Sequence, residues 1–478
     1  MAPPVVIIAA AFSALVAAGA VAQTTATASA PAAPVAAAPA AAPAFITQNV
    51  AWTDVTPQVA GALPYNPISA GAILPAAALA AYPDMPSTTG GLAWPDSNEQ
   101  KGVINLPALL SSPLVANALA LVNKTVDQTF LAIPQSLRVD NSGKTQYAMG
   151  DLGVAAANCW WPSSNCVSPT QTNFAYLKPD VASCPGANVL GLNYDDGPST
   201  TVQNNGTSTQ DLAAQLASMN QKATFFATGS NSYMNPQALK DLYNAGHEIA
   251  VHSWSHAPMT SLTTEQIVAE IKYTEAIIYA IIGRRPRYFR APYGDIDNRV
   301  RAIAGALGYE SVLWGHDKDT GDSDGGTLAS VVTAFTSWNL PNQPGFIDLE
   351  HSLNIQSNDY AIAALKAAQT AQAAGTWTLT MMPVGQCQGK TSYVDLTGAA
   401  LPNLPAASTP AAAAQTTSLG AAVPTPVVAG STVGSKPASP TPSGSAQDIP
   451  HSAAGSQACA GAGAVGALAV LAAVSHLL

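Results

Sequence analysis

The chain is 478 residues long, carries a net charge of −10 and contains only 18 lysine and arginine residues. Nucleic acids and anionic membrane surfaces are bound through basic patches, and the sequence has no Lys/Arg cluster, so neither is expected as a partner. The length alone would allow about three domains. Both ends, however, are dominated by Ala, Pro, Ser and Thr and cannot bury enough apolar surface to fold. The rest suits one catalytic domain and an N-terminal region.

Residues 1–22 are expected to form a cleavable signal peptide. Their apolar stretch ends in A-V-A at positions 20–22, which matches the A-x-A cleavage pattern. A membrane-spanning helix is the alternative, but the stretch is short and polar residues follow it directly. Residues 23–44 form an Ala/Pro/Thr tract that is typical of a flexible linker.

Residues 45–183 have no chemistry that the sequence identifies. They contain a helix-like apolar segment at Leu106–Val122 and several turn-rich stretches. We therefore expect a less regular N-terminal extension of unknown role.

From residue 184 to residue 388, strand-like and helix-like segments alternate. Strands are expected at 189–194, 223–226, 247–251, 288–290, 311–314, 346–350 and 377–381. Helices are expected at 211–219, 236–244, 264–282, 299–307, 328–338 and 360–373. This alternation predicts an α/β fold with parallel strands, as a barrel or as an open sheet.

The C-terminal part returns to low complexity. Residues 400–450 are rich in Pro, Ser, Thr and Ala and are expected to form an O-glycosylated stalk. Residues 451–478 combine small residues with a terminal apolar tail, which is typical of a signal for a glycosylphosphatidylinositol (GPI) anchor. The candidate attachment residues are Ser452 or, alternatively, Ala453, Ala454, Gly455 and Ser456. A conventional membrane helix is the alternative.

Five cysteines are present, and Cys459 lies in the tail that anchor attachment would remove. The other four allow two disulfides in an oxidising compartment, with three possible connectivities. We expect Cys184–Cys387 to join the two ends of the strand–helix series and Cys159–Cys166 to close a local loop.

Two N-x-T patterns begin at Asn123 and Asn205. Such patterns are frequent by chance, but they become meaningful in a secreted protein. We expect N-linked glycans at both.

Unusual polar segments follow five of the expected strands. They are Tyr194–Pro198, His252–His256, Arg290–Gly294, Trp314–Asp322 and Asp348–Ser352. The active sites of α/β barrels lie at the carboxyl ends of the strands. These segments are therefore expected to meet at one site.

His252 and His256 have a spacing that, on one helical turn, directs both imidazoles to the same side. An isolated H-x-x-x-H is more often two surface histidines, but the chain has only seven histidines and these two follow a buried strand. A carboxylate from Asp196 would complete a two-His, one-carboxylate set with an open position for water. Asp195 and Asp196 would most often form a turn in isolation. Here one can bind a metal and the other can accept a proton.

In this order, the five segments resemble the motifs of the carbohydrate esterase family 4 polysaccharide deacetylases, the NodB-homology fold, over roughly residues 185–385. With the stalk and the anchor signal, the chain is similar to the fungal chitin deacetylases of that family. The resemblance implies a distorted (β/α) barrel of about seven parallel strands. It also implies one divalent metal ion, zinc or cobalt.

The same resemblance implies roles for individual residues. Asp195 is the general base, which Arg290 holds in place, and His351 is the general acid. The metal ligands are Asp196, His252 and His256. The backbone N–H of Tyr293 stabilises the oxyanion, Leu349 lines the pocket for the acetyl methyl group, and Trp314 is a further substrate contact.

The sequence departs from the family pattern at two points. Asn193 and Tyr194 stand where Thr and Phe are commoner, with little expected effect. The fourth motif lacks its usual aromatic residue, because Ser323 follows Asp322. That motif supplies the aspartate that orients the acid histidine, and we favour Asp319 over Asp317 for this role.

These expectations define a secreted, monomeric hydrolase at the cell wall, held on the membrane only through the anchor. It removes acetyl groups from chitin or chitin oligomers and leaves chitosan and acetate. The alternatives are a deacetylase of another acetylated polysaccharide and an inactive wall-binding protein on the same fold.

Overall fold

The computed structural model describes residues 72–87, 94–95, 102–140, 142–171, 173–200, 206–398 and 400–401. These residues belong to one compact unit. The predicted signal peptide, linker, stalk and anchor-attachment signal lie outside the described residues, and so does Asn205. They stay predictions from the sequence.

Short helices and one hairpin make up the N-terminal region. The elements are α1 (Ala76–Leu79), α2 (Pro107–Leu110), α3 (Pro113–Thr125), α4 (Gln128–Leu131), β1 (Leu137–Arg138), β2 (Thr145–Gln146), η1 (Met149–Asp151), α5 (Leu152–Ala157) and α6 (Trp161–Ser164). The single helix predicted at Leu106–Val122 is in fact two helices. Ser112 caps α3 by accepting a hydrogen bond from the Val115 N–H, and Pro113 occupies the first helical position, where its missing N–H costs nothing.

The polar segments follow the C-terminal ends of strands that belong to parallel sheets. Strands β4, β5, β6, β8 and β9 form one five-stranded parallel sheet in that order. Strand β3 pairs in parallel with both β10 and β11. The bounds are β3 (Val189–Gly191), β4 (Asn193–Asp195), β5 (Thr224–Ala227), β6 (Glu248–Val251), β8 (Tyr288–Phe289), β9 (Glu310–Ser311), β10 (Phe346–Ile347) and β11 (Thr380–Met382). The predicted α/β class with parallel strands is confirmed.

A small antiparallel sheet accompanies them. It has the order β13–β12–β7, with β7 at Arg285–Pro286, β12 at Tyr393–Val394 and β13 at Ala400–Leu401.

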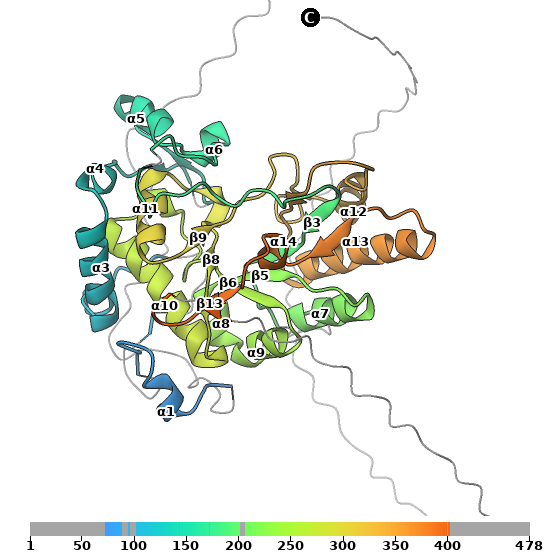
Figure 1. Cartoon of the computed structure of the whole chain (residues 1–478), viewed down its shortest axis with the longest axis horizontal. Helices are drawn as coiled ribbons and strands as arrows, with labels where there is room; N and C mark the ends of the chain where they lie inside the picture. The colour runs from blue at the N-terminus through green and yellow to red at the C-terminus, as the bar shows by residue number, and fades with distance from the viewer. Residues whose placement is uncertain are drawn as a thin grey trace, which may run out of the picture. The chain divides into compact units, whose positions relative to one another are not determined.

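Helices pack outside the strands, which run through the centre of the domain (Figure 1). They are α7 (Thr209–Ser218), α8 (Gly229–Met234), α9 (Pro236–Asn244), η2 (Met259–Ser261), α10 (Thr264–Ile282), η3 (Pro292–Gly294), α11 (Asn298–Ala306), α12 (Leu328–Ser337), α13 (Ile355–Ala373) and α14 (Val384–Cys387). Among the described residues, none of the helices combines the length and the apolar character needed to cross a membrane.

The long helix α10 is the centre of the packing on one side of the sheet. A capping box of Thr263 and Gln266 satisfies its first N–H groups, and Gly283 ends it in the left-handed conformation at φ 68°. It contacts α3 of the N-terminal region as well as α8, α9 and α11. Helix α10 therefore joins the N-terminal region to the strand–helix series.

The predicted elements agree with the structure except at some boundaries. The helix expected from residue 360 begins five residues earlier, because Asn354 caps it by accepting from the Ser357 N–H. The strand expected at 346–350 has ladder pairing only at β10. Beyond it, the Leu349 N–H donates to the Lys318 carbonyl, so a loop replaces a neighbouring strand there.

Both predicted disulfides are present. Cys184 bonds to Cys387 across a sequence separation of 203 residues, and Cys159 bonds to Cys166 across seven residues. The first bond joins the segment before β3 to α14, so it clamps the two ends of the strand–helix series.

Removing the long-range disulfide is expected to destabilise the protein far more than removing the local one. In the chain-entropy model, the Cys184→Ser/Cys387→Ser double variant loses about 5 kcal/mol of unfolding free energy, and Cys159→Ser/Cys166→Ser loses about 2 kcal/mol. Urea titrations followed by circular dichroism measure both. Equal losses for the two variants would contradict this prediction.

Candidate metal centre

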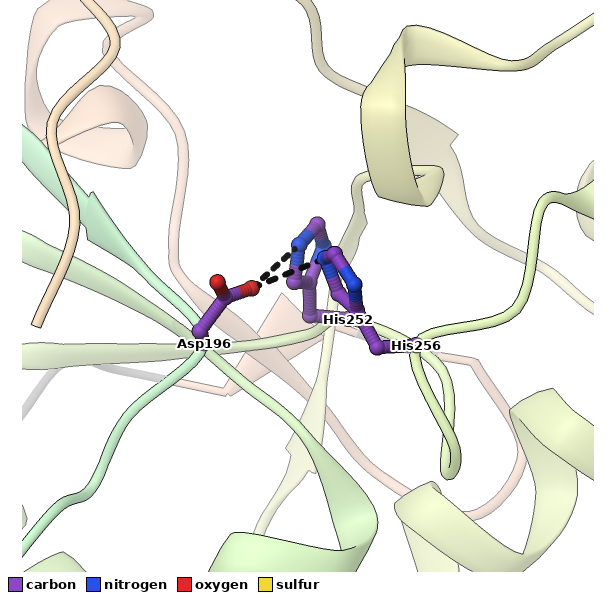
Figure 2. A group of neighbouring side chains, drawn as sticks. All are labelled: Asp196, His252 and His256. Atoms are coloured by element: carbon purple, nitrogen blue, oxygen red, sulfur yellow. Dashed lines mark ion pairs between the residues drawn. The ribbon is translucent and has the colours of Figure 1, made fainter. Parts of the chain in front are cut away.

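Three side chains from two strand ends converge at the carboxyl edge of the five-stranded sheet (Figure 2). Asp196 follows β4, and His252 and His256 follow β6. Asp196 Oδ1 lies 3.1 Å from His252 Nε2 and 2.9 Å from His256 Nε2. All three residues are buried, and one ligand atom from each lies within 4.8 Å of the others. The structure therefore brings the predicted set together.

The chemistry of these atoms fits a bound cation. His252 Nδ1 lies 2.9 Å from the carbonyl oxygen of Arg290, so Nδ1 is the donor of this contact and Nε2 is left to present a lone pair to a cation. That lone pair faces a carboxylate oxygen of Asp196, which is also an acceptor. Two buried acceptors this close repel each other unless a proton or a metal ion lies between them. Two imidazoles and one carboxylate are a known donor set for Zn²⁺ in catalytic sites.

The backbone of Asp196 is held firmly although its conformation is strained. Its φ is 74°, in the left-handed region that side chains other than glycine rarely adopt. Its N–H donates to the Phe226 carbonyl, and its own carbonyl accepts from Thr228 Oγ1 and Asn231 Nδ2.

The histidine segment is a loop, which corrects the prediction of a helical turn. Ser253 and His256 have φ values of 60° and 56°, so the backbone cannot continue as a right-handed helix. Ser253 Oγ accepts a hydrogen bond from the His256 N–H. Backbone curvature, rather than helical periodicity, therefore turns both Nε2 atoms toward Asp196.

A buried carboxylate from α10 organises this loop. Glu270 Oε2 accepts from the N–H groups of Trp254 and Ser255, both at 2.8 Å. Glu270 Oε1 accepts from Ser255 Oγ at 2.7 Å and from the Ile104 N–H of the N-terminal region at 3.2 Å. The sequence did not identify Glu270, because a glutamate within a long helix carries no local signal of this role.

Asp195 faces a buried arginine on the other side of the metal centre. Arg290 Nη1 donates to Asp195 Oδ1 at 2.8 Å and also to Asn193 Oδ1. The guanidinium carbon lies 4.1 Å from the centroid of the Phe226 ring, which fixes the plane of the arginine. Asp195 Oδ2 lies 3.7 Å from His252 Nε2. The two adjacent aspartates thus have different partners, as predicted.

One carboxylate binds both the imidazole and the backbone N–H of His351. Asp322 Oδ1 lies 2.7 Å from His351 Nδ1, and Asp322 Oδ2 accepts from the His351 backbone N–H at 2.8 Å. Burial by itself lowers the pKa of His351, but the charge and the hydrogen bond of Asp322 raise it to about 10. His351 therefore carries a proton at neutral pH, and Nε2 is the nitrogen left for other partners.

This geometry corrects the choice between Asp319 and Asp317. Asp319 Oδ1 accepts from the Gly321 N–H and so shapes its own turn. Asp317 is exposed and pairs with Lys318 at 2.8 Å. Asp322 belongs to the same motif, but it was not predicted to orient His351. Its proximity to His351 arises from the turn at Gly321, whose φ of 69° redirects the chain.

Two acidic side chains lie buried behind the site. Burial raises the pKa of Asp348 well above its usual range, and Asp348 accepts from the Asn193 N–H and side-chain amide. Burial, reinforced by the neighbouring acidic groups of Asp348 and Asp322, also raises the pKa of Glu350 well above its usual range. Both side chains therefore favour the neutral acid form.

The remaining predicted residues border the site at different distances. The ring of Tyr293 packs edge-on against His256, with centroids 4.6 Å apart, and Tyr293 is 37% exposed. The ring of Trp314 lies 5.5 Å from the Arg290 guanidinium. Leu349 is buried two residues before His351. Asn123, one of the two predicted glycan acceptors, is exposed on α3 of the N-terminal region.

Comparisons with known proteins agree with this geometry. Residues 182–312 match the family model described as Polysaccharide deacetylase. The chain is 37% identical over 262 residues to Chitin deacetylase 1 of Cryptococcus neoformans var. grubii, covering 50% of this chain and 52% of that protein. It is 33% identical over 248 residues to Chitin deacetylase 1 of Saccharomyces cerevisiae, covering 51% of this chain and 71% of that protein. The matched segment thus spans about half of the length of the Cryptococcus protein.

Among solved structures, the chitin deacetylase of Colletotrichum lindemuthianum overlaps with a TM-score of 0.40 at 22% identity, covering 45% of this chain and 95% of that chain. The sequence matches define the class, and the chain belongs to the polysaccharide deacetylase family, carbohydrate esterase family 4.

Replacing Glu270 by glutamine is expected to weaken Zn²⁺ binding about 10- to 100-fold, the usual cost of losing a group that orients metal ligands. The amide offers one acceptor oxygen and a donor that would face backbone N–H groups. Competition with a chromophoric chelator measures the affinity. The matched control is Glu275→Gln, because Glu275 is buried on the same helix but pairs with Arg285 and Lys272. Equal Zn²⁺ affinities in the two variants would refute this role of Glu270.

Proposed function

We propose that this chain is a metal-dependent N-deacetylase that hydrolyses the acetamide groups of chitin and leaves chitosan and acetate. The observation that carries the proposal is the buried set of Asp196, His252 and His256. Beside this set Asp195 forms an ion pair with Arg290, and a protonated His351 lies nearby. This arrangement supplies a metal site, a base and an acid, the three groups that amide hydrolysis needs. The chitin substrate rests on the names of the relatives.

In this proposal Asp195 and Asp196 have different roles, as a base and as a metal ligand. Asp195 accepts a proton from the water that attacks the acetamide carbonyl, and the hydrogen bond from Arg290 holds its carboxylate in place. Asp196, His252 and His256 hold a divalent ion, zinc or cobalt, which when bound would polarise the carbonyl and make the attacking water more acidic. The backbone N–H of Tyr293 donates to the developing oxyanion.

His351 completes the reaction by protonating the leaving amine. The C–N bond breaks as the amine nitrogen takes the proton from Nε2, while Asp322 holds Nδ1. Leu349 and Trp314 form the walls for the acetyl methyl group and the sugar.

We further propose that the parallel strands close into a distorted barrel of about seven strands. A supporting hydrogen bond links the segment after β9 to the end of β10, from Gly315 N–H to the Ile347 carbonyl, and the Leu349 N–H beyond β10 donates to the Lys318 carbonyl. Others link the segment after β10 back to β4, from Asp195 N–H to the Glu350 carbonyl and from Ser352 N–H to the Asp195 carbonyl. Closure would aim all five polar segments into one cavity mouth.

The proposed location is the cell wall, reached by secretion, with a monomeric enzyme held by a GPI anchor. The two disulfides support an oxidising compartment, because such bonds are rare in reducing ones. The deacetylase domain is proposed to span 184–388, preceded by the N-terminal region and followed by the stalk.

Asp195→Asn and Asp196→Asn are expected to fail in different ways. The wild type should release acetate from chitin oligomers, lose this activity with a chelator and regain it with Zn²⁺ or Co²⁺. Asp196→Asn should lower the metal content, because an amide is a poorer ligand than a carboxylate. Asp195→Asn should keep the metal and lose about 10²–10⁴-fold in kcat.

The measurements are metal content by mass spectrometry and acetate release by mass analysis of the oligomers. Full acetate release by metal-stripped protein would overturn the metal dependence. Intact metal and activity in Asp196→Asn, with metal loss in Asp195→Asn, would reverse the two assignments. No acetate release from chitin oligomers by metal-loaded wild type would leave the alternatives of another polysaccharide or a wall-binding protein.

The rate is expected to fall at alkaline pH as His351 loses its proton near pH 10. Asp322→Asn removes the partner that opposes burial, so the alkaline limb of kcat against pH should move down by about 1–3 pH units. Since the folded pKa lies above the unfolded value of about 6.5, the wild-type stabilisation from this pair is complete below that pH and is lost toward pH 10. An unchanged pH profile in Asp322→Asn would exclude this coupling.

A further inference from the structure

The N-terminal region is bound to the segment that follows Arg290. Thr145 Oγ1 and Trp160 Nε1 both donate to Asp295 Oδ1, at 2.8 and 3.0 Å. Tyr147 OH donates to Asp297 Oδ2. All of these acceptors are buried and lie within a few residues of the η3 turn, Pro292–Gly294. Part of the chain with no assigned role thus contacts the loop that carries Tyr293.

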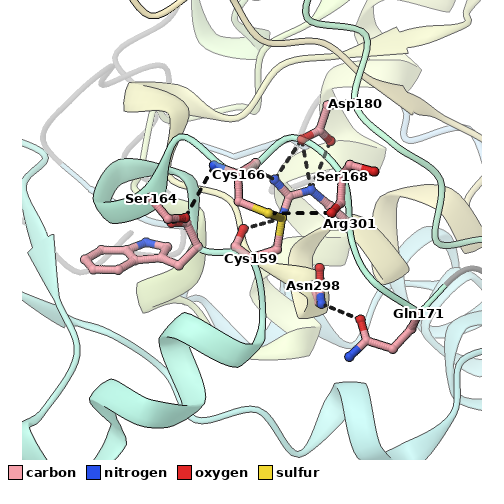
Figure 3. The surroundings of a disulfide bond; sticks show 9 residues. Cys159, Ser164, Cys166, Ser168, Gln171, Asp180, Asn298 and Arg301 are labelled. Carbon is pink, nitrogen blue, oxygen red and sulfur yellow. Dashed lines mark hydrogen bonds and ion pairs between the residues drawn. A yellow bond between two sulfur atoms is a disulfide. The ribbon is translucent and has the colours of Figure 1, made fainter. Parts of the chain in front are cut away.

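Backbone contacts and a disulfide complete this attachment (Figure 3). Arg301 Nη1 donates to the Cys159 carbonyl at 2.6 Å, and Nη2 donates to the Cys166 carbonyl at 2.8 Å. Arg301 also donates to the carboxylate of Asp180, so a single buried guanidinium hydrogen-bonds to both ends of the disulfide loop. The Trp161 N–H, inside this loop, donates to the Ile296 carbonyl at 3.0 Å. The disulfide loop is therefore fixed against α11 and η3.

The η3 turn itself is strained. Tyr293 has a φ of 59° and Gly294 a φ of 63°, so two successive residues lie in the left-handed region. This conformation costs a tyrosine of the order of 1 kcal/mol or more and persists only where the surroundings enforce it. The enforcing contacts must therefore come from groups packed against the turn.

Two contacts from the N-terminal region do this. Gly143, at the tip of the β1–β2 hairpin, lies so close to the Tyr293 ring that an added Cβ would be 2.1 Å from the ring carbon Cζ. A Cβ on Gly294 would lie 2.4 Å from the Trp161 ring. The Tyr293 ring also packs edge-on against His256, so it contacts both the hairpin tip and a metal ligand.

We propose that Gly143 and Trp161 are positioning residues that hold the Tyr293 backbone N–H in its reactive orientation. This inference rests on the proposed function of Tyr293 as the oxyanion donor. The N-terminal region then acts as a clamp on the catalytic loop. Gly143 is required because any side chain there would push the Tyr293 ring, and with it the backbone N–H, out of place.

The test compares Gly143→Ala with Gly375→Ala in the full chain. Both glycines have a positive φ, 81° and 69°, so both variants carry similar backbone strain, but a Cβ at Gly375 meets nothing within 4 Å. Gly143→Ala should lower kcat about 10- to 100-fold, the cost expected for a misplacement near 1 Å, with KM and metal content unchanged. Gly375→Ala should keep the wild-type kcat.

A second readout is independent of activity. Hydrogen–deuterium exchange of the peptide covering Arg290–Ile296 should be faster in Gly143→Ala and in Thr145→Val, which loses its hydrogen bond to Asp295 without adding bulk. It should be unchanged in Gly375→Ala. Absence of acetate release by the wild type would refute the proposed function and leave the exchange comparison intact. Exchange and kcat in Gly143→Ala and Thr145→Val equal to those in Gly375→Ala would overturn the clamp.

Discussion

A buried carboxylate oxygen facing two imidazole nitrogens is the interaction on which the rest of this structure depends. Such an arrangement of buried acceptors is unfavourable by itself, and a cation is the group that makes it favourable. The surrounding structure serves to keep the three atoms in place. Asp196 is fixed in a strained conformation by Thr228 and Asn231, and the histidine loop is tied by Glu270.

Charge is distributed around this centre so that neighbouring carboxyl groups do different work. Asp195 faces Arg290, Asp322 faces a protonated imidazole, and Asp348 and Glu350 are driven by burial toward their neutral forms. Carboxyl groups of one cluster thereby serve as the partner of an arginine, as a metal ligand and as the partner of a histidine, while burial disfavours the charged form of the remaining two. Environment, and not residue type, sets each role.

The N-terminal region contacts two groups of residues that support the site. Ile104 donates to the carboxylate that holds the histidine loop, and Thr145, Tyr147 and Trp160 donate to the aspartates that follow η3. The N-terminal region therefore contacts both the Asp295 and Asp297 segment after the Tyr293 turn and the carboxylate that holds the His252–His256 loop. The region is part of the site although it lies far from the motifs in sequence.

Much of this protein was determined by its sequence alone. The alternation of apolar segments determined the α/β class, and helices 236–244 and 264–282 were predicted to the residue, because a helix is set by local periodicity and capping groups. The ligand set and both disulfides also followed from residue type and position along the chain. The tertiary structure decided that Asp322 rather than Asp319 holds His351, that a curved loop presents His252 and His256, and that Glu270 and Gly143 support the site. These depend on left-handed turns and on contacts between segments distant in the chain, and no local pattern of side chains encodes such distances.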